Sequence, residues 1–354
     1  MKLSFISSQA IQNAMRQTIR QAQNEMTSAS TEATTGVYAD IGVALGSNTS
    51  RSVNLTREVS RIDSILGSNS VANQRMSTSQ TALTDMGSQA QKLMNQLVAL
   101  RGNTDSNSVA LTKQIATSSL SSVIASGNTM VNGEYLFAGT NTDVQPMTDN
   151  STATNKAITD ALNSYAATLY PNPTAPQTAV GSLTGAQITS FITTKVEPMF
   201  TSDSGWASWS SASDQNMTSR ISNSEVVDTS TNSNSAGMRY MALASTVANA
   251  LTGTTPALNQ DAQNAVTDQA ISYARQSIDG LNTQASQLGL SQSRLSDANT
   301  TLNAQKTILN TNIGNLTGVD PYEASTKVNS LQTQLETAYT IVSKIQQLSL
   351  VNYL

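Results

Sequence analysis

The sequence predicts a mainly α-helical fold, in which the N- and C-terminal segments form a long antiparallel helical rod or coiled coil that carries a small inserted α+β domain. Leucine recurs at every seventh position in a long stretch near the C-terminus. In a stretch of the N-terminal third, apolar residues are spaced alternately three and four positions apart. Both tryptophans lie between these two stretches, in a segment without heptads. Heptad spacing is typical of helices that pack against each other along their length.

The leucine ladder defines one apolar edge of a helix that extends from Ile278 to Leu316. Its members are Leu281, Leu288, Leu295, Leu302, Leu309 and Leu316. At 1.5 Å of rise per residue this edge is roughly 55 Å long, so we expect helices of similar length to cover it. Gln292, Asn299 and Lys306 share the edge, where polar side chains usually fix the register of a helix pair at some cost in stability. We interpret the ladder as the core of the protein's own bundle; the alternative is a seam that dimerises.

The N-terminal third supplies the expected partner of the ladder. Residues 8–34 form a first amphipathic helix with weak apolar anchors, and a glycine-rich loop follows Gly36. A second, much longer helix begins near Leu55 and ends at the Arg101-Gly102-Asn103 break. We expect three of its apolar side chains to lie in the rod core with the ladder: Ile62, Leu83 and Leu97. A third helix, residues 105–131, ends at an Asn-Gly turn signal.

The segment between about 145 and 230 has a different character, because it is rich in proline and lacks heptads. Preceding it, residues 134–140 are short, aromatic and bounded by glycine, as in a strand. Within it we expect helices at 155–169 and 184–195 and strands at 217–222 and 225–230. Its large aromatic side chains, Phe200, Trp206 and Trp209, are interpreted as the core of a small domain and not as a ligand cage.

Two further helices follow the insert and precede the C-terminus. Residues 236–251 form the first and lead into the ladder helix; Asp320 and Pro321 then give the last helix an N-cap and a proline at its first position. The apolar edge of this last helix continues almost to the final residue. Both terminal helices are amphipathic and lie outside the rod, so we expect neighbouring subunits to cover them. The expected subunit-interface residues are Ile11, Met15, Leu331, Leu335, Val342, Ile345, Leu348 and Leu350.

These elements predict three domains. They are a terminal coiled-coil assembly domain (1–45 and 318–354), a helical rod domain with a short β element near 134–140 (46–145 and 235–317), and an inserted outer α+β domain (146–234).

Composition excludes the commonest catalytic and metal sites. The 354-residue chain has no Cys and no His, which excludes Cys/His nucleophilic pairs, Ser-His-Asp triads, structural zinc and histidine-bound metals. No phosphate-binding glycine motif is present, and no carboxylate pair has a recognisable acid/base spacing. Asp203, Asp214 and Glu225 are conceivable acids of a hydrolase without a supporting spacing. We therefore expect no enzyme and no cofactor.

Charge is sparse, since charged residues make up 12% of the chain and the net charge is −4. Such a chain has no electrostatic reason to bind nucleic acid or acidic membranes, and its surface suits close packing of identical copies. No run of apolar residues approaches the length of a transmembrane helix, and the N-terminus lacks a cleavable secretory signal.

Four segments resemble the flagellin superfamily and, within it, the flagellar hook-associated protein 3 family of hook-filament junction proteins. They are the ending LSLVNYL (348–354), the segment GVDPYEA (318–324), NGEYLFAGT (132–140) and LGLSQSRL (288–295). The resemblance covers about 1–140 and 235–354. The family usually has Gly-Lys-Arg and then Ser-Asp-Asp-Pro after its first helix, whereas residues 35–42 here keep only the Thr-Gly.

This resemblance implies an extracellular structural protein of the bacterial flagellum, exported through the type III channel without a cleaved signal. We expect deletion of the insert, about 150–230, to spare export and assembly. Its implied partners are other copies of itself, hook-associated protein 1, flagellin, the export apparatus and an export chaperone at the C-terminal helix. A flagellin filament subunit is the near alternative. The Asn-Tyr-Leu ending favours the junction protein, because flagellins tend to stop at Leu-Leu or add Arg. A chemoreceptor-like signalling module is the alternative from another class, although it requires membrane spans and an uninterrupted hairpin.

Overall fold

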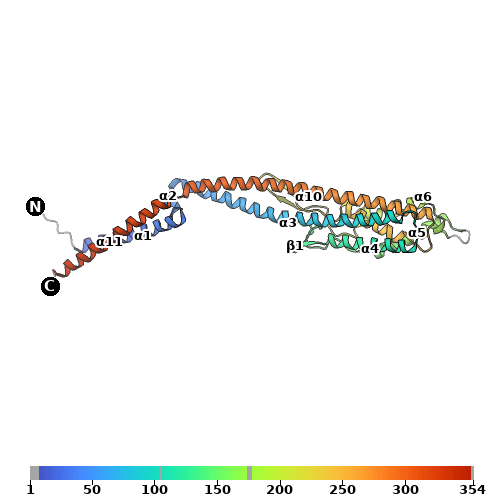
Figure 1. Ribbon diagram of the computed structural model, residues 1–354, viewed down its shortest axis with the longest axis horizontal. Helices are drawn as coiled ribbons and strands as arrows, with labels where there is room; N and C mark the ends of the chain where they lie inside the picture. Colours follow the sequence, from blue (N-terminus) through green and yellow to red (C-terminus); the bar gives the residue numbers. More distant parts are fainter. Residues whose placement is uncertain (1–7, 104, 174–177, 352–354) are drawn as a thin grey trace. The chain divides into compact units, whose positions relative to one another are not determined.

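The computed structural model describes residues 8–103, 105–173 and 178–351, with side chains described from residue 10 to residue 347 within these ranges. The chain divides into two compact units. Unit 1 consists of residues 1–64 and 301–354, and unit 2 consists of residues 65–300. Two long helices, α3 (Thr49–Leu100) and α10 (Gln260–Thr317), each contribute one end to unit 1 and the remainder to unit 2 (Figure 1).

The mainly α-helical prediction is confirmed. The other helices are α1 (Ser8–Thr35), α2 (Ile41–Leu45), α4 (Ser106–Gly127), α5 (Ser151–Leu169), α6 (Gly185–Phe191), α7 (Pro198–Thr201), α8 (Asp203–Trp206), α9 (Ala236–Leu251) and α11 (Pro321–Val351), with 3₁₀ turns η1 (Gly46–Asn48) and η2 (Val180–Ser182) and a π-helical turn η3 (Ile192–Val196). Two antiparallel hairpins complete the described elements: β1 (Met130–Val131) with β2 (Glu134–Tyr135), and β3 (Thr218–Arg220) with β4 (Val226–Asp228). The three-domain division remains a prediction.

Three short segments differ from the sequence prediction. The helix expected over 105–131 is α4, which ends at Gly127, and residues 130–131 belong to β1. The expected loop after Gly36 contains the one-turn helix α2, because the Asp40 carboxylate accepts a hydrogen bond from the Val43 amide at 2.9 Å and so caps it. The expected strand at 134–140 is limited to β2. Beyond it, the Phe137 and Ala138 carbonyls accept hydrogen bonds from the separate amides of Ser233 and Ser213, so these residues are satisfied without a ladder.

Helices α3 and α10 run antiparallel, and hydrogen bonds and an ion pair lie along their apolar contact. In unit 2, Leu83, Leu97, Leu281, Leu288 and Leu295 are all buried. Gln292 donates a hydrogen bond to Asn73 at 3.4 Å, and Asn299 accepts one from the buried Asn69 at 2.7 Å. In unit 1, Ile62 and Leu302 are buried, and the Lys306 ammonium lies 2.6 Å from the Asp63 carboxylate. Each polar residue on the leucine edge thus contacts a polar partner on α3.

Helix α9 lies at the centre of unit 2, where the inserted segment and the long helices share one core. Residues 241–248 of α9 are all buried, and the same cluster contains Phe200, Trp206 and Trp209. The α9 and α10 backbones touch at Gly237 and Gly280, where a β-carbon on Gly237 would lie 2.6 Å from the Leu281 nitrogen. The inserted segment therefore covers α9 and forms part of the core of unit 2.

Tyr273 is a buried tyrosine whose ionisation is expected to link the stability of unit 2 to alkaline pH. It is buried on α10, and its hydroxyl donates a hydrogen bond to the Glu197 carboxylate at 2.7 Å. Burial, and then this hydrogen bond, raise the pKa of Tyr273 above its ordinary value. A tyrosine in the unfolded chain ionises near pH ~10, so above that pH the unfolded state binds fewer protons than the folded state.

We therefore expect the free energy of unfolding to be unaffected by this group below pH ~10 and to fall as the pH rises from there through the folded pKa. The substitution Tyr273→Phe should flatten this alkaline slope, whereas Tyr322→Phe, at an exposed position, should not. Urea unfolding followed by circular dichroism at several pH values measures the slope. Equal slopes in the two variants would contradict the prediction.

Candidate assembly interface

The terminal helices α1 and α11 form an antiparallel pair in unit 1 with a thin apolar seam. Its buried cluster contains Ala22, Ala29, Leu331 and Leu335, with the half-buried Ile19, Met26 and Val328 packed against it. Among the side chains that the structure describes, one hydrogen bond crosses the pair, from the Gln23 amide to the Tyr339 hydroxyl at 2.9 Å. None of the ion pairs among the described residues joins α1 to α11. Two alanines and two leucines are a small core for helices of 28 and 31 residues.

Backbone hydrogen bonds join the chain segments where this pair begins. The Val319 amide donates to the Gly36 carbonyl at 2.9 Å, and the Tyr38 amide donates to the Thr317 carbonyl at 3.0 Å. Gly36 has φ +68°, a left-handed conformation that glycine adopts without strain. The end of α1 is therefore tied to the junction between α10 and α11, which places the two terminal helices side by side.

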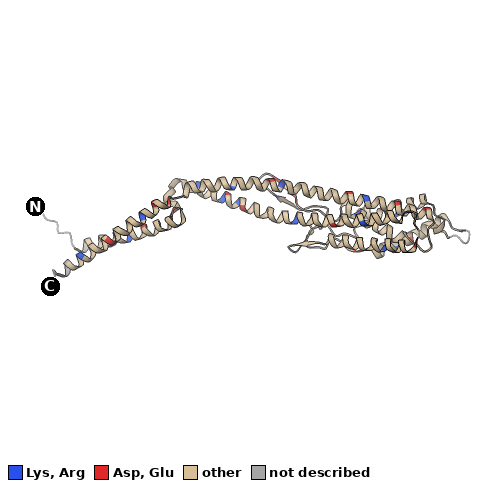
Figure 2. Ribbon diagram, in the orientation of Figure 1, with Lys and Arg blue, Asp and Glu red and all other residues tan. Residues whose placement is uncertain are grey.

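Several large apolar side chains of unit 1 lie outside the seam. Tyr322 is 82% exposed, Ile341 is 37% exposed and Ile11 is 37% exposed. A shallow groove of about 330 Å³ on α1 is lined by Ala10, Ile11, Ala14, Met15 and Thr18. Figure 2 shows that acidic and basic residues are sparse along both helices, so little charge opposes contact with another apolar surface.

The structure places the predicted interface residues at graded depths. Leu331 and Leu335 are buried at 6% exposure each, in the seam between α1 and α11. Met15, Val342 and Ile345 are half-buried, and Ile11 is at the exposed rim. Leu348 and Leu350 were also predicted as interface residues, but their side chains lie outside the described residues. The role of these residues as subunit contacts remains a prediction, and Leu331 and Leu335 already have partners within one chain.

Burial of the predicted rod-core ladder decreases toward the C-terminal end of α10. Leu302 is buried, whereas Leu309 and Leu316 are only half-buried. On the same stretch of α10, Ile308 is 62% exposed. The ladder leucines are therefore buried as far as Leu302. Beyond Leu302, α10 leaves apolar side chains partly exposed.

Sequence reasoning missed other exposed apolar side chains of unit 1. Tyr38, Ile41, Val43 and Tyr322 all lie near the backbone connection between Gly36 and Val319. Tyr38, Ile41 and Val43 were overlooked because the loop prediction assigned no apolar surface to residues 36–48. Large apolar residues in a glycine-bounded segment are unusual for a solvated loop, and this was the signal that could have found them.

In the dilute monomer we expect the amides of α1 and α11 to exchange with solvent at least about tenfold faster than those of α9, since local stability follows buried contacts. The reason is the thin seam, which contrasts with the complete burial of α9. Hydrogen exchange with mass spectrometry, backed by limited proteolysis, measures this difference. Protection of residues 10–30 and 325–347 equal to that of α9 would show that the terminal pair is complete without neighbours.

Comparisons with known proteins place the same two ends of the chain in one family. Residues 6–142 match the family model of the bacterial flagellin N-terminal helical region, and residues 271–354 match that of the bacterial flagellin C-terminal helical region. Together these ranges make up more than half of the chain. A search of curated proteins found no match. None of the helices in the described ranges has an apolar stretch that could cross a membrane.

A solved structure from Vibrio parahaemolyticus, provisionally assigned as a flagellar hook-associated protein, has a similar fold. The two chains superpose with a TM-score of 0.53 at 11% sequence identity, over 76% of this chain and 97% of the other. At this level of identity the similarity concerns the fold.

Proposed function

Because the chain belongs to the flagellin superfamily and is therefore a structural component of the bacterial flagellum, outside the cell, we propose that it is the junction protein between hook-associated protein 1 and the flagellin filament. It assembles with copies of itself through α1 and α11. The observation that carries this proposal is the thin seam between these helices, with large apolar side chains left exposed around it.

One chain leaves much of the apolar surface of α1 and α11 uncovered. Isolated helix pairs with few buried groups are marginal, and exposed apolar surface is costly unless something covers it. A ring of identical subunits places the α1 and α11 surfaces of one copy against those of the next, and the low charge of both helices favours that contact. The terminal pair then becomes stable on assembly, and unit 2 supplies a folded body before assembly.

The junction role rests on a sequence motif and on the need for an adapter. The motif Asn352-Tyr353-Leu354 resembles junction proteins more than flagellins. Hook and filament subunits pack differently, so a short ring between them needs ends that pack on two kinds of neighbour. Export through the flagellar type III channel without a cleaved signal, with a chaperone on the C-terminal helix, belongs to the same proposal.

A flagellin filament subunit is the second candidate, because both matched family models describe flagellin regions. A chemoreceptor-like signalling module is disfavoured by these matches and by the insert that separates α3 from α10.

Immunogold labelling of intact flagella distinguishes the two flagellar candidates. The junction proposal expects a narrow band of gold at the distal end of the hook. Gold along the whole filament would contradict the junction proposal and would show that the protein is a filament subunit. A strain that lacks the gene serves as the labelling control and should, on the junction proposal, secrete unassembled flagellin.

A further inference from the structure

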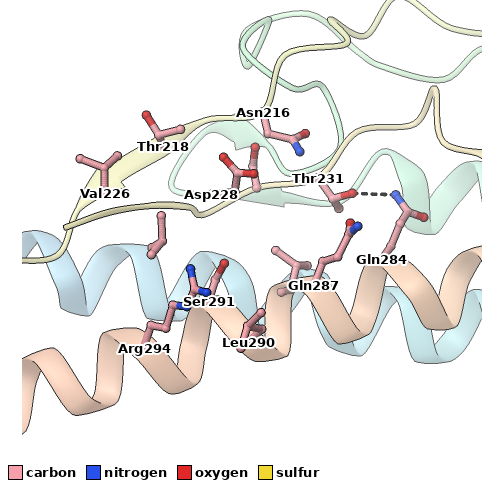
Figure 3. Close-up of a pocket in the computed structure, with 13 residues that line it drawn as sticks. Asn216, Thr218, Val226, Asp228, Thr231, Gln284, Gln287, Leu290, Ser291 and Arg294 are labelled. Carbon is pink, nitrogen blue, oxygen red and sulfur yellow. Dashed lines mark hydrogen bonds between the residues drawn. The ribbon is translucent and has the colours of Figure 1, made fainter.

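A polar groove of about 500 Å³ lies in unit 2 between the β3–β4 hairpin and α10, away from the terminal helices (Figure 3). Its volume is within the range of about 300 to 1,000 Å³ that is typical of ligand pockets. Side chains from the hairpin and from successive turns of α10 line it. The proposed role in the flagellum makes no use of this groove.

The inner surface of the groove is polar and buried. Ser230, Thr231 and Gln284 line it, and each is more than nine-tenths buried. The Gln284 amide donates to the Thr231 hydroxyl at 2.6 Å and to the Asn232 carbonyl at 3.1 Å, which fixes the side chain. Its Oε1 atom has no hydrogen-bond partner in the described part of the chain. The Gln284 amide holds Thr231 and the Asn232 backbone against α10 and fixes the inner wall of the groove.

Two opposite charges line the same groove from its two walls. Asp228 extends from β4 and Arg294 from α10. Within the described ranges, neither side chain makes an ion pair or a hydrogen bond, although both line one groove. A ligand that carries both an ammonium and a carboxylate group would pair with both walls, and the planar guanidinium is suited to hold a carboxylate with two parallel hydrogen bonds.

The open edge of β4 favours a peptide over other zwitterions. Hydrogen bonds from Thr229 to Met217 and from Ile221 to Glu225 mark hydrogen-bonded pairs of the hairpin. These pairs alternate with non-bonded ones, so the amide and carbonyl groups of Val226 and Asp228 point away from β3 and are available to another extended backbone.

We propose that this groove binds a short zwitterionic peptide of two or three residues. Arg294 holds the carboxylate, Asp228 holds the ammonium group, and the edge of β4 pairs with the peptide backbone. Leu290, 57% exposed at the rim, contacts an apolar side chain of the ligand. The inference is independent of the junction proposal, because no residue of α1 or α11 takes part.

The dipeptide alanyl-leucine, titrated into the full chain by isothermal calorimetry, tests the proposal together with its N-acetylated and C-amidated forms. We expect saturable binding of the free dipeptide. Arg294→Gln should weaken it about tenfold and leave the affinity of the C-amidated form unchanged, because that form lacks the carboxylate. Asp228→Asn should weaken the free dipeptide similarly and leave the N-acetylated form unchanged.

Arg275→Gln and Asp279→Asn are the matched controls, since both residues are exposed on α10 and do not line the groove. They should bind the dipeptide as the parent does. Circular dichroism confirms that each variant is folded. The proposal would be overturned if the folded parent showed no saturable binding, or if neither groove substitution changed the affinity. Equal binding of the neutral disaccharide maltose would also overturn it. Flagellar incorporation should be normal in all four variants, so failure here leaves the junction proposal standing.

Discussion

Leu335→Asp is expected to abolish incorporation of the protein into the flagellum while leaving unit 2 folded. Leu335 is 6% exposed and packs with Ala22, Ala29 and Leu331 in the small core of the terminal pair. An unpaired carboxylate there costs several kcal/mol, roughly 2–7 even for an uncharged polar group without a partner. So few buried side chains cannot offset this cost, so we expect α11 to separate from α1. Neighbouring copies could then no longer pack against the pair. Electron microscopy of flagella from a strain that carries the variant measures incorporation.

The control for this experiment uses the same helix and the same new charge. Gln334 is exposed on α11, so Gln334→Asp should incorporate like the parent. Both tryptophans of the chain lie in unit 2, and their fluorescence therefore reports the folding of that unit alone. Parent-like fluorescence is expected for both variants. If Leu335→Asp still joined the flagellum, the α1–α11 seam would not be required for assembly.

Deleting residues 150–230 is expected to unfold unit 2. From the sequence we predicted that deleting this insert would spare export and assembly; the structure places its aromatic side chains in the same core as α9, which is the reason to expect a loss of folding. The deletion would expose Met241, Leu243 and Val247, which are fully buried. A single substitution within the insert, Trp209→Ala, should already lower the free energy of unfolding by about 3–5 kcal/mol. Urea unfolding followed by circular dichroism measures both variants.

Lys156→Ala is the matched control, because this residue lies in the insert but is exposed on α5. Its effect should stay within about 0.5 kcal/mol, as for most surface substitutions. A deletion variant that unfolds with the cooperativity of the parent would show that the insert is a separate domain, as the sequence suggested.

The positions of the long helices could be predicted from the sequence because helical periodicity is a local property. The seven-residue spacing from Leu281 to Leu316 requires one helix with one apolar edge, whatever covers it. Asp320 and Pro321 likewise locate the start of α11, where the Asp320 carboxylate accepts a hydrogen bond from the Tyr322 amide at 2.8 Å. The β3–β4 hairpin was also anticipated, since both strands lie within the predicted ranges.

The partners of those edges could not be predicted in the same way. The seam residues Gln292, Asn299 and Lys306 were recognised as polar, yet their partners on α3 are about 220 to 245 positions away in the chain. Heptads do not specify which turn of one helix faces which turn of another. The α2 turn and the exposed apolar side chains near it were missed for a related reason, because an isolated turn has no period to detect.

By itself, the sequence determined that the chain consists mainly of long amphipathic helices, that it lacks the residues for the common catalytic and metal sites, and that its two ends resemble flagellins. Only the tertiary structure decided that the insert shares its core with α9, how thin the α1–α11 seam is, and that Asp228 and Arg294 line one groove. The physical reason is that periodicity and composition belong to single segments. Burial depends on which distant segments meet, and that is settled by packing across the whole unit.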